Sequence, residues 1–82
     1  MRYIRISMIQ EIYKDYIIIA NPKKTANNKW KVSTIIQRKT INGLKKRHFT
    51  AEDKIEYILE IEAAKESINL GKNLIKKNMV GF

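Results

Sequence analysis

The sequence predicts an α+β domain, in which an antiparallel meander of three or four strands precedes one long C-terminal helix packed on one face (βββα). Short runs rich in Ile, Val and Tyr fill the first half of the chain between turn-forming residues, as is typical of strands. In the second half, apolar or small side chains recur at alternating spacings of four and three residues, as on one face of a helix. This stripe comprises Tyr57, Ile61, Ala64, Ile68, Gly71 and Ile75.

The length of 82 residues predicts a single domain, residues 1–82. A domain of this size buries only about 60–65% of the surface of its unfolded chain, so its core is small. The chain has no cysteine, so disulfides and thiolate metal sites cannot add stability, and a homodimer is an open alternative. The lack of cysteine also agrees with a cytoplasmic protein.

Membrane association is not expected. The longest apolar run, Tyr16 to Ala20, is far shorter than the roughly 20 residues that a membrane-spanning helix needs. Arg2 and Arg5 precede no apolar stretch of the kind found in signal peptides. Met8 is an alternative start of the chain.

The first strands are predicted from local composition. Residues 2–9 loosely alternate, so we predict an edge strand or an extension of the domain at residues 1–10, whereas residues 12–20 predict a firmer strand. Three consecutive isoleucines at 17–19 make both faces of that strand apolar, as in a central strand or one that meets a partner. Pro22 ends the strand because it lacks a backbone donor, and a basic loop follows at residues 23–29.

The next strand is predicted at residues 30–38, with Trp30, Val32, Thr34 and Ile36 on a buried face. Asn42 and Gly43 between extended runs then favour a type I′ turn, whose two central positions need positive φ. This turn pairs Ile36 with Phe49 and opposes like charges twice, Lys39 with Lys46 and Arg38 with Arg47. Opposed like charges cost stability, so the hairpin is more cationic than folding requires.

The helix is predicted over residues 50–78, with Thr50 as its N-cap and Asp53 three residues later. Ile55, Tyr57 and Leu59 also alternate as a strand would. The alternative is therefore that residues 49–59 prolong the third strand or add another, and that the helix begins near Glu60. Within the stripe, Gly71 costs about 1 kcal/mol relative to Ala. This cost predicts a close approach of the helix to the sheet, beneath Trp30.

Charge is the most informative bulk property. The net charge is +9, but residues 1–49 carry twelve Lys and Arg against two acids (+10), while residues 50–82 carry five Lys against six acids (−1). Such asymmetry favours a polyanionic partner, nucleic acid or an acidic protein. The alternative is a lysine-rich composition typical of an A·T-rich genome.

Catalysis is poorly supported. His48 is the sole histidine, cysteine is absent, and the serines lie in no nucleophile motif. Neither a glycine-rich phosphate loop nor a calcium-ligand spacing is present. We therefore expect a non-enzymatic protein without a metal or a cofactor.

The basic hairpin is the predicted binding site, because clustered cations contact phosphates and exposed aromatic rings stack on bases. The candidate residues are Arg38, Lys39, Lys45, Lys46 and Arg47, with Lys31 nearby and Tyr13 for stacking. One alternative is a solvated hairpin whose lysines protect a sheet edge. Another is a protein–protein interaction module or homodimer, a regulator or an effector, suggested by the two-sided isoleucine strand.

One set of residues invites comparison with known domains: Tyr13, Tyr16, Ile18, Pro22, Trp30 and Val32, then Glu62 and Ala63, then Gly71, Lys72, Leu74 and Ile75. With these residues and its basic hairpin, the chain resembles small bacterial β-meander-plus-helix domains of unknown function over most of residues 12–75. The resemblance implies a fold and carries no activity. The order of strands and helix is also similar to that of PUR-type single-strand binders, in topology alone.

Overall fold

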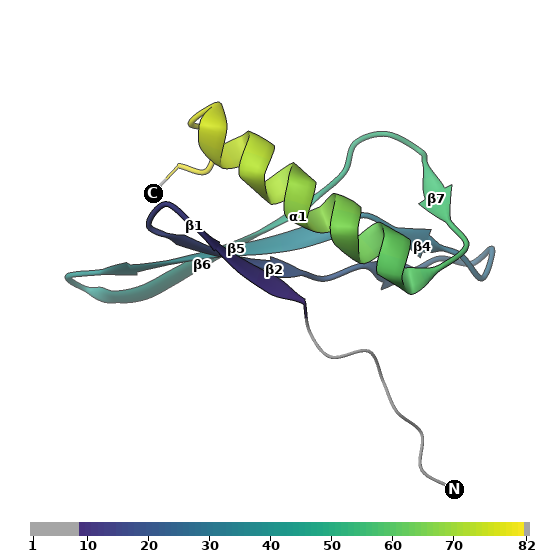
Figure 1. Cartoon of the computed structure of the whole chain (residues 1–82), viewed down its shortest axis with the longest axis horizontal. Helices are drawn as coiled ribbons and strands as arrows, with labels where there is room; N and C mark the ends of the chain where they lie inside the picture. Colours follow the sequence, from purple (N-terminus) through teal and green to yellow (C-terminus); the bar gives the residue numbers. More distant parts are fainter. Residues whose placement is uncertain (1–8, 82) are drawn as a thin grey trace, which may run out of the picture.

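The computed structural model describes residues 9–81 and contains two antiparallel sheets and one helix, which confirms the predicted α+β class (Figure 1). The larger sheet is a four-stranded meander in the order β1-β2-β5-β6. Its strands are β1 (Gln10–Tyr13), β2 (Tyr16–Ala20), β5 (Ser33–Thr40) and β6 (Gly43–Thr50). Most of the edge strand or extension predicted at residues 1–10 lies outside the described residues.

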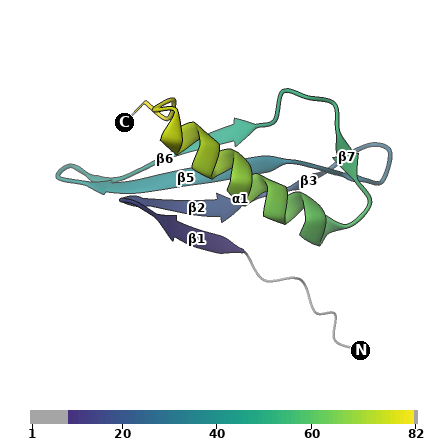
Figure 2. The ribbon, with the colours of Figure 1, turned by 45° about the horizontal axis from the view of Figure 1, so that its top comes forward.

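A smaller sheet lies at the end of the molecule away from the β5–β6 turn (Figure 2). It consists of β3 (Lys23–Lys24), β4 (Trp30–Lys31) and β7 (Glu56–Tyr57). Two predicted strands are therefore divided. Residues 12–20 turn back at Lys14, whose φ is 56°, and residues 30–38 are split between β4 and β5.

The helix α1 (Glu60–Lys76) begins ten residues later than predicted, so the range 50–78 is wrong and the alternative start near Glu60 is confirmed. Thr50 is the last residue of β6, and Glu56 and Tyr57 pair with β4. This pairing gives the backbone of residues 56–57 its hydrogen-bond partners in a sheet, so local helix propensity does not decide the structure there. The Asp53 side chain accepts a hydrogen bond from the Ile55 N–H (3.1 Å) and caps no helix.

The turn between β5 and β6 also differs from the prediction. Thr40 pairs with Gly43, so the loop residues are Ile41 and Asn42, both with negative φ, and Gly43 has φ of 114°. The Thr40 hydroxyl donates to the Gly43 carbonyl (2.7 Å). A turn followed by a glycine with positive φ replaces the type I′ turn.

The new register shifts each partner by two residues. The two predicted like-charge pairs are absent, because Lys39 faces Leu44 and Arg47 faces Ile36. A different like-charge pair, Arg38 with Lys45, forms instead. Phe49 pairs with Thr34 rather than Ile36. A shift of two residues leaves each side chain on its predicted face, because strand side chains alternate with a period of two.

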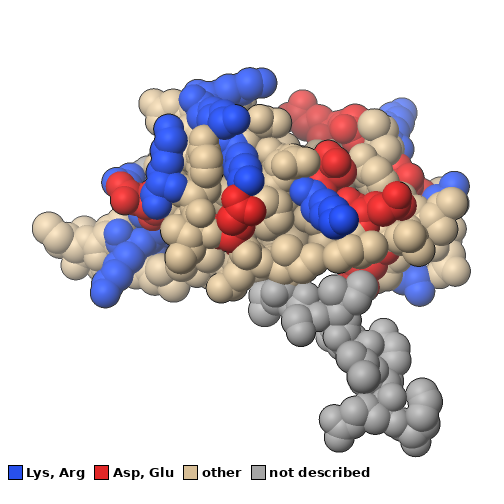
Figure 3. Space-filling model, in the orientation of Figure 1, with Lys and Arg blue, Asp and Glu red and all other residues tan. Residues whose placement is uncertain are grey.

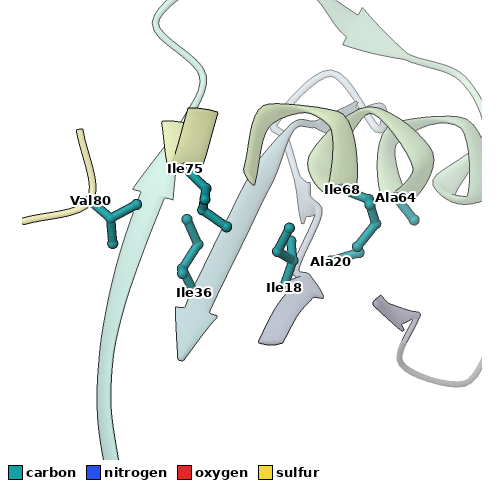
Figure 4. Packing of buried hydrophobic residues seen from close by; sticks show 7 residues of the cluster. All are labelled: Ile18, Ala20, Ile36, Ala64, Ile68, Ile75 and Val80. Atoms are coloured by element: carbon teal, nitrogen blue, oxygen red, sulfur yellow. The ribbon is translucent and has the colours of Figure 1, made fainter. Parts of the chain in front are cut away.

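The core lies between α1 and the larger sheet (Figure 4). Ile18 of β2 and Ile36 of β5 pair with each other and are fully buried (0% exposed). A Cβ placed on Gly71 would lie 2.5 Å from Ile18 Cγ2. The predicted close approach at Gly71 is confirmed, but it is made to Ile18 and not to Trp30. The buried cluster comprises Ile18, Ala20, Ile36, Ala64, Ile68, Ile75 and Val80.

Candidate functional site

The candidate site is the β5–β6 ribbon, which we define as Ser33–Thr40 and Gly43–Thr50 together with the turn between them. Strand β2 pairs with β5 only as far as Arg38, whereas β5 and β6 stay paired up to Thr40 and Gly43. The apex, residues 39–44, therefore has no third strand beside it and extends beyond the sheet (Figures 1 and 2). At about 3.4 Å per residue, this free part is roughly 7–10 Å long.

The cations of the ribbon lie on both of its faces. Ile36 is buried beneath α1 and side chains alternate along a strand, so the even-numbered central positions of β5 face the helix. The pairing register then assigns every cation of β5 and β6 to a side. The helix side carries Arg38, Lys45 and Arg47, and the opposite, open face carries Lys39 and Lys46. Five of the seven predicted residues are thus brought together.

The ribbon has no carboxylate of its own, because no Asp or Glu occurs between Asp15 and Glu52. Within residues 9–81, the side chains of Lys39, Lys45 and Lys46 form no salt bridge, and all three residues are exposed. The salt bridge between Lys72 Nζ and Glu11 Oε2 (2.5 Å) joins α1 to β1 instead. The three ribbon lysines are therefore available to an external anion.

The two arginines of the ribbon make contacts within the fold. The Arg38 guanidinium lies 5.3 Å from the centre of the Tyr16 ring, a cation–π contact. A Cβ placed on Gly81 would lie 3.6 Å from the Arg47 guanidinium, so the C-terminal segment passes close to it. The cation–π contact orients Arg38 at the base of the ribbon, and Arg47 lies there beside the C-terminal segment.

Lys31 lies apart from the ribbon. In β4, it pairs with Glu56 of β7, and its Nζ donates to the Asp53 carbonyl (3.0 Å). This position is at the end of the molecule opposite the apex (Figure 1). The expectation that Lys31 lies near the hairpin is therefore wrong, because the chain between residues 31 and 38 is extended and separates them.

Tyr13 is also not on an open surface. It pairs with Tyr16 on the helix side of the sheet, is half-buried, and packs against the core cluster. The Lys14 Nζ lies 5.7 Å from the centre of its ring. On the open face, the described strands of the larger sheet carry no Tyr, Phe or Trp, so none of these strands offers a ring there for stacking on bases.

The apex carries two apolar side chains that the sequence prediction missed. Ile41 is 99% exposed and Leu44 is 61% exposed. The sequence contained a signal for this apolar apex, because an isoleucine stands directly beside the predicted turn residues Asn42 and Gly43 in a segment rich in Lys and Arg. Turn positions of this kind usually carry polar residues, so an apolar side chain there is informative.

A pocket of about 200 Å³ lies between the middle of α1 and the segment before the helix, and its lining includes Asp53, Glu66 and Tyr57, the last from β7 at the end of the molecule away from the apex. Burial, and then the charges of Glu66, Asp53 and Glu62, raise the pKa of the Tyr57 hydroxyl above its ordinary value. Figure 3 shows acidic side chains gathered toward this end of the molecule. Within residues 9–81, no group of three His, Cys, Asp or Glu side chains is placed to hold a metal ion.

The described part of the chain contains no helix that combines the length and the apolarity needed to cross a membrane. Comparisons of the chain with protein families, with curated proteins and with solved structures find no match. The resemblance to bacterial β-meander-plus-helix domains therefore stays a prediction.

Proposed function

We propose that this protein is a small, non-enzymatic module that binds nucleic acid through the β5–β6 ribbon. The observation that supports the proposal is a protruding, acid-free ribbon with cations on both faces. Contacts to phosphates supply most of the sequence-independent affinity of such proteins. A ribbon that is positive on both faces is suited to lie between two phosphate backbones. A cytoplasmic location fits this role.

A protein–protein module is the second candidate, favoured by one observation. On the open face, Ile12 is 75% exposed beside the half-buried Ile17, and no described element covers them. A second copy or an acidic partner would cover these side chains. A molecular mass that stays monomeric at all concentrations would argue against the homodimer.

The proposed function is tested by the salt dependence of binding. We expect the protein to bind short oligonucleotides at about 50 mM salt and to lose much of this affinity at about 200 mM, because bound phosphates release counterions. Lys45→Ala/Lys46→Ala should reduce the slope of log K against log salt by about 2, since each lysine accounts for roughly one contact. Fluorescence anisotropy of a labelled oligonucleotide measures both quantities.

A matched control separates the ribbon from net charge. Lys23→Ala/Lys29→Ala removes the same charge from two exposed residues at the far end of the molecule. This variant should bind nearly as tightly as the parent protein. Equal loss in the two variants, or no salt-dependent binding at micromolar protein, would refute a site on the ribbon.

A further inference from the structure

The apex presents an isoleucine to solvent. Ile41 lies in a two-residue loop, which is closed by the pairing of Thr40 with Gly43 and by the hydrogen bond from the Thr40 hydroxyl to the Gly43 carbonyl. Ile41 is 99% exposed. Exposure of a large apolar side chain is unfavourable in water, and Ile41 contributes nothing to the core. Leu44, 61% exposed, follows three residues later. Folding does not explain an apolar apex on a cationic ribbon.

The dimensions of the ribbon match one groove of duplex DNA. Its two strands are about 4.8 Å apart and carry side chains on both faces. The major groove, about 12 Å wide and about 8.5 Å deep, admits a two-stranded ribbon, whereas the minor groove is only about 6 Å wide. The roughly 7–10 Å of free ribbon equals the depth of the major groove. In duplex RNA, the major groove is deep and narrow and does not admit side chains.

The cations are placed to hold the ribbon in such a groove. Lys45 lies on the helix side of the ribbon, and Lys39 and Lys46 lie on the open face. With the apex at the bases, these side chains lie nearer the groove rims, where the two phosphate backbones run. The apex then meets base edges that carry polar groups and a single apolar one, the C5 methyl of thymine.

We infer that the ligand of the ribbon is duplex DNA, and that Ile41 at the apex contacts thymine methyl groups in the major groove. This inference rests on the proposed nucleic-acid function. It gives the exposed isoleucine a partner of matching chemistry. Asn42, exposed beside Ile41, has the amide that pairs with the major-groove edge of adenine, the base opposite thymine.

The test removes only the methyl groups. A short A·T-rich DNA duplex is compared with the same duplex in which deoxyuridine replaces thymidine, and binding is measured by anisotropy. The parent protein should bind the uracil duplex about fourfold more weakly for each methyl contacted. Ile41→Ala should bind both duplexes alike, at the weaker affinity. A duplex with inosine·cytosine pairs, which keeps the minor groove of A·T pairs but alters the major groove, should also bind more weakly.

The control variant is Ile58→Ala, which removes another exposed isoleucine (75% exposed) from the loop before α1. It should keep the parent's preference for thymine. Equal salt-dependent binding of thymine and uracil duplexes would overturn the inference and leave the proposed function standing. Tighter binding to duplex RNA, or an effect of Ile41→Ala on anionic lipid vesicles but not on DNA, would also overturn it. Absence of salt-dependent binding to every nucleic acid would refute both proposals.

Discussion

Gly71 shows how one absent side chain sets the distance between the helix and the sheet. It faces Ile18, and the Ile18 side chain occupies the space where a Cβ would stand. A glycine inside a helix lowers helix stability by about 1 kcal/mol relative to alanine. The helix retains it because packing against β2 leaves no room for a larger residue.

Gly71→Ala should therefore destabilise the fold by about 1–3 kcal/mol, because overpacking the core outweighs the gain in helix propensity. The free energy of unfolding in urea measures this change. Asn73→Ala, at an exposed position of the same helix, is the control and should stabilise the fold by up to about 0.7 kcal/mol, the gain in helix propensity alone. In the Ile18→Ala variant, Gly71→Ala should lower the free energy of unfolding by less, because the side chain that the new methyl group meets is smaller. An equal loss in the parent protein and in the Ile18→Ala variant would contradict the contact between Gly71 and Ile18.

The helix α1 illustrates how an element begins without the expected cap. Its N-cap is Leu59, with extended backbone (φ −103°, ψ 133°) and no side-chain hydrogen bond to the first turn. Extended dihedrals of this kind are those of a good N-cap residue. The backbone is therefore suited to a capping side chain that leucine cannot supply.

Leu59→Ser should stabilise the protein by about 1 kcal/mol, since the hydroxyl accepts a hydrogen bond from a free N–H of the first turn. Thermal or urea unfolding measures the gain. Ile58→Ser changes an exposed neighbour outside the helix (75% exposed, against 54% for Leu59) and should give no such gain. If both serines act alike, the effect comes from lower surface hydrophobicity and not from capping.

Positive charge predominates over the whole molecule, since 17 Lys and Arg stand against 8 Asp and Glu, and Lys and Arg side chains lie at both ends of its long axis (Figure 3). Its net charge of +9 favours expansion through self-repulsion. The cross-strand pair of Arg38 and Lys45 adds a local unfavourable contact. The charges that would bind a polyanion therefore weaken the free protein.

Added salt should stabilise the free protein, because screening reduces this repulsion over distances beyond about 10 Å at 0.1 M. Lys45→Gln should raise the free energy of unfolding at low salt by about 0.2–1 kcal/mol. Lys72→Gln removes the same charge but breaks the salt bridge to Glu11, so it should have the opposite sign. Destabilisation of the protein by moderate salt would contradict the repulsion.

Much of the candidate site followed from local sequence. The acid-poor hairpin and its cations were readable because residues on two adjacent strands joined by a tight turn must lie together. The predicted face of each side chain is correct although the predicted turn is wrong, because shifting the pairing of β5 and β6 by two residues leaves every side chain on the same face. The positions of Lys31 and Tyr13 were not readable, because they depend on which distant strands pair.

By itself, the sequence determined the α+β class, the helix stripe from Ala64 to Ile75 and the basic ribbon, because each arises from periodicity or from neighbouring residues. Tertiary structure alone decided that Glu56 and Tyr57 join β4 as a strand, which delays the helix to Glu60. It also placed Gly71 on Ile18 and left Ile41 beyond the end of β2. Pairing between distant strands and contacts between layers are long-range interactions that no local window of the sequence contains.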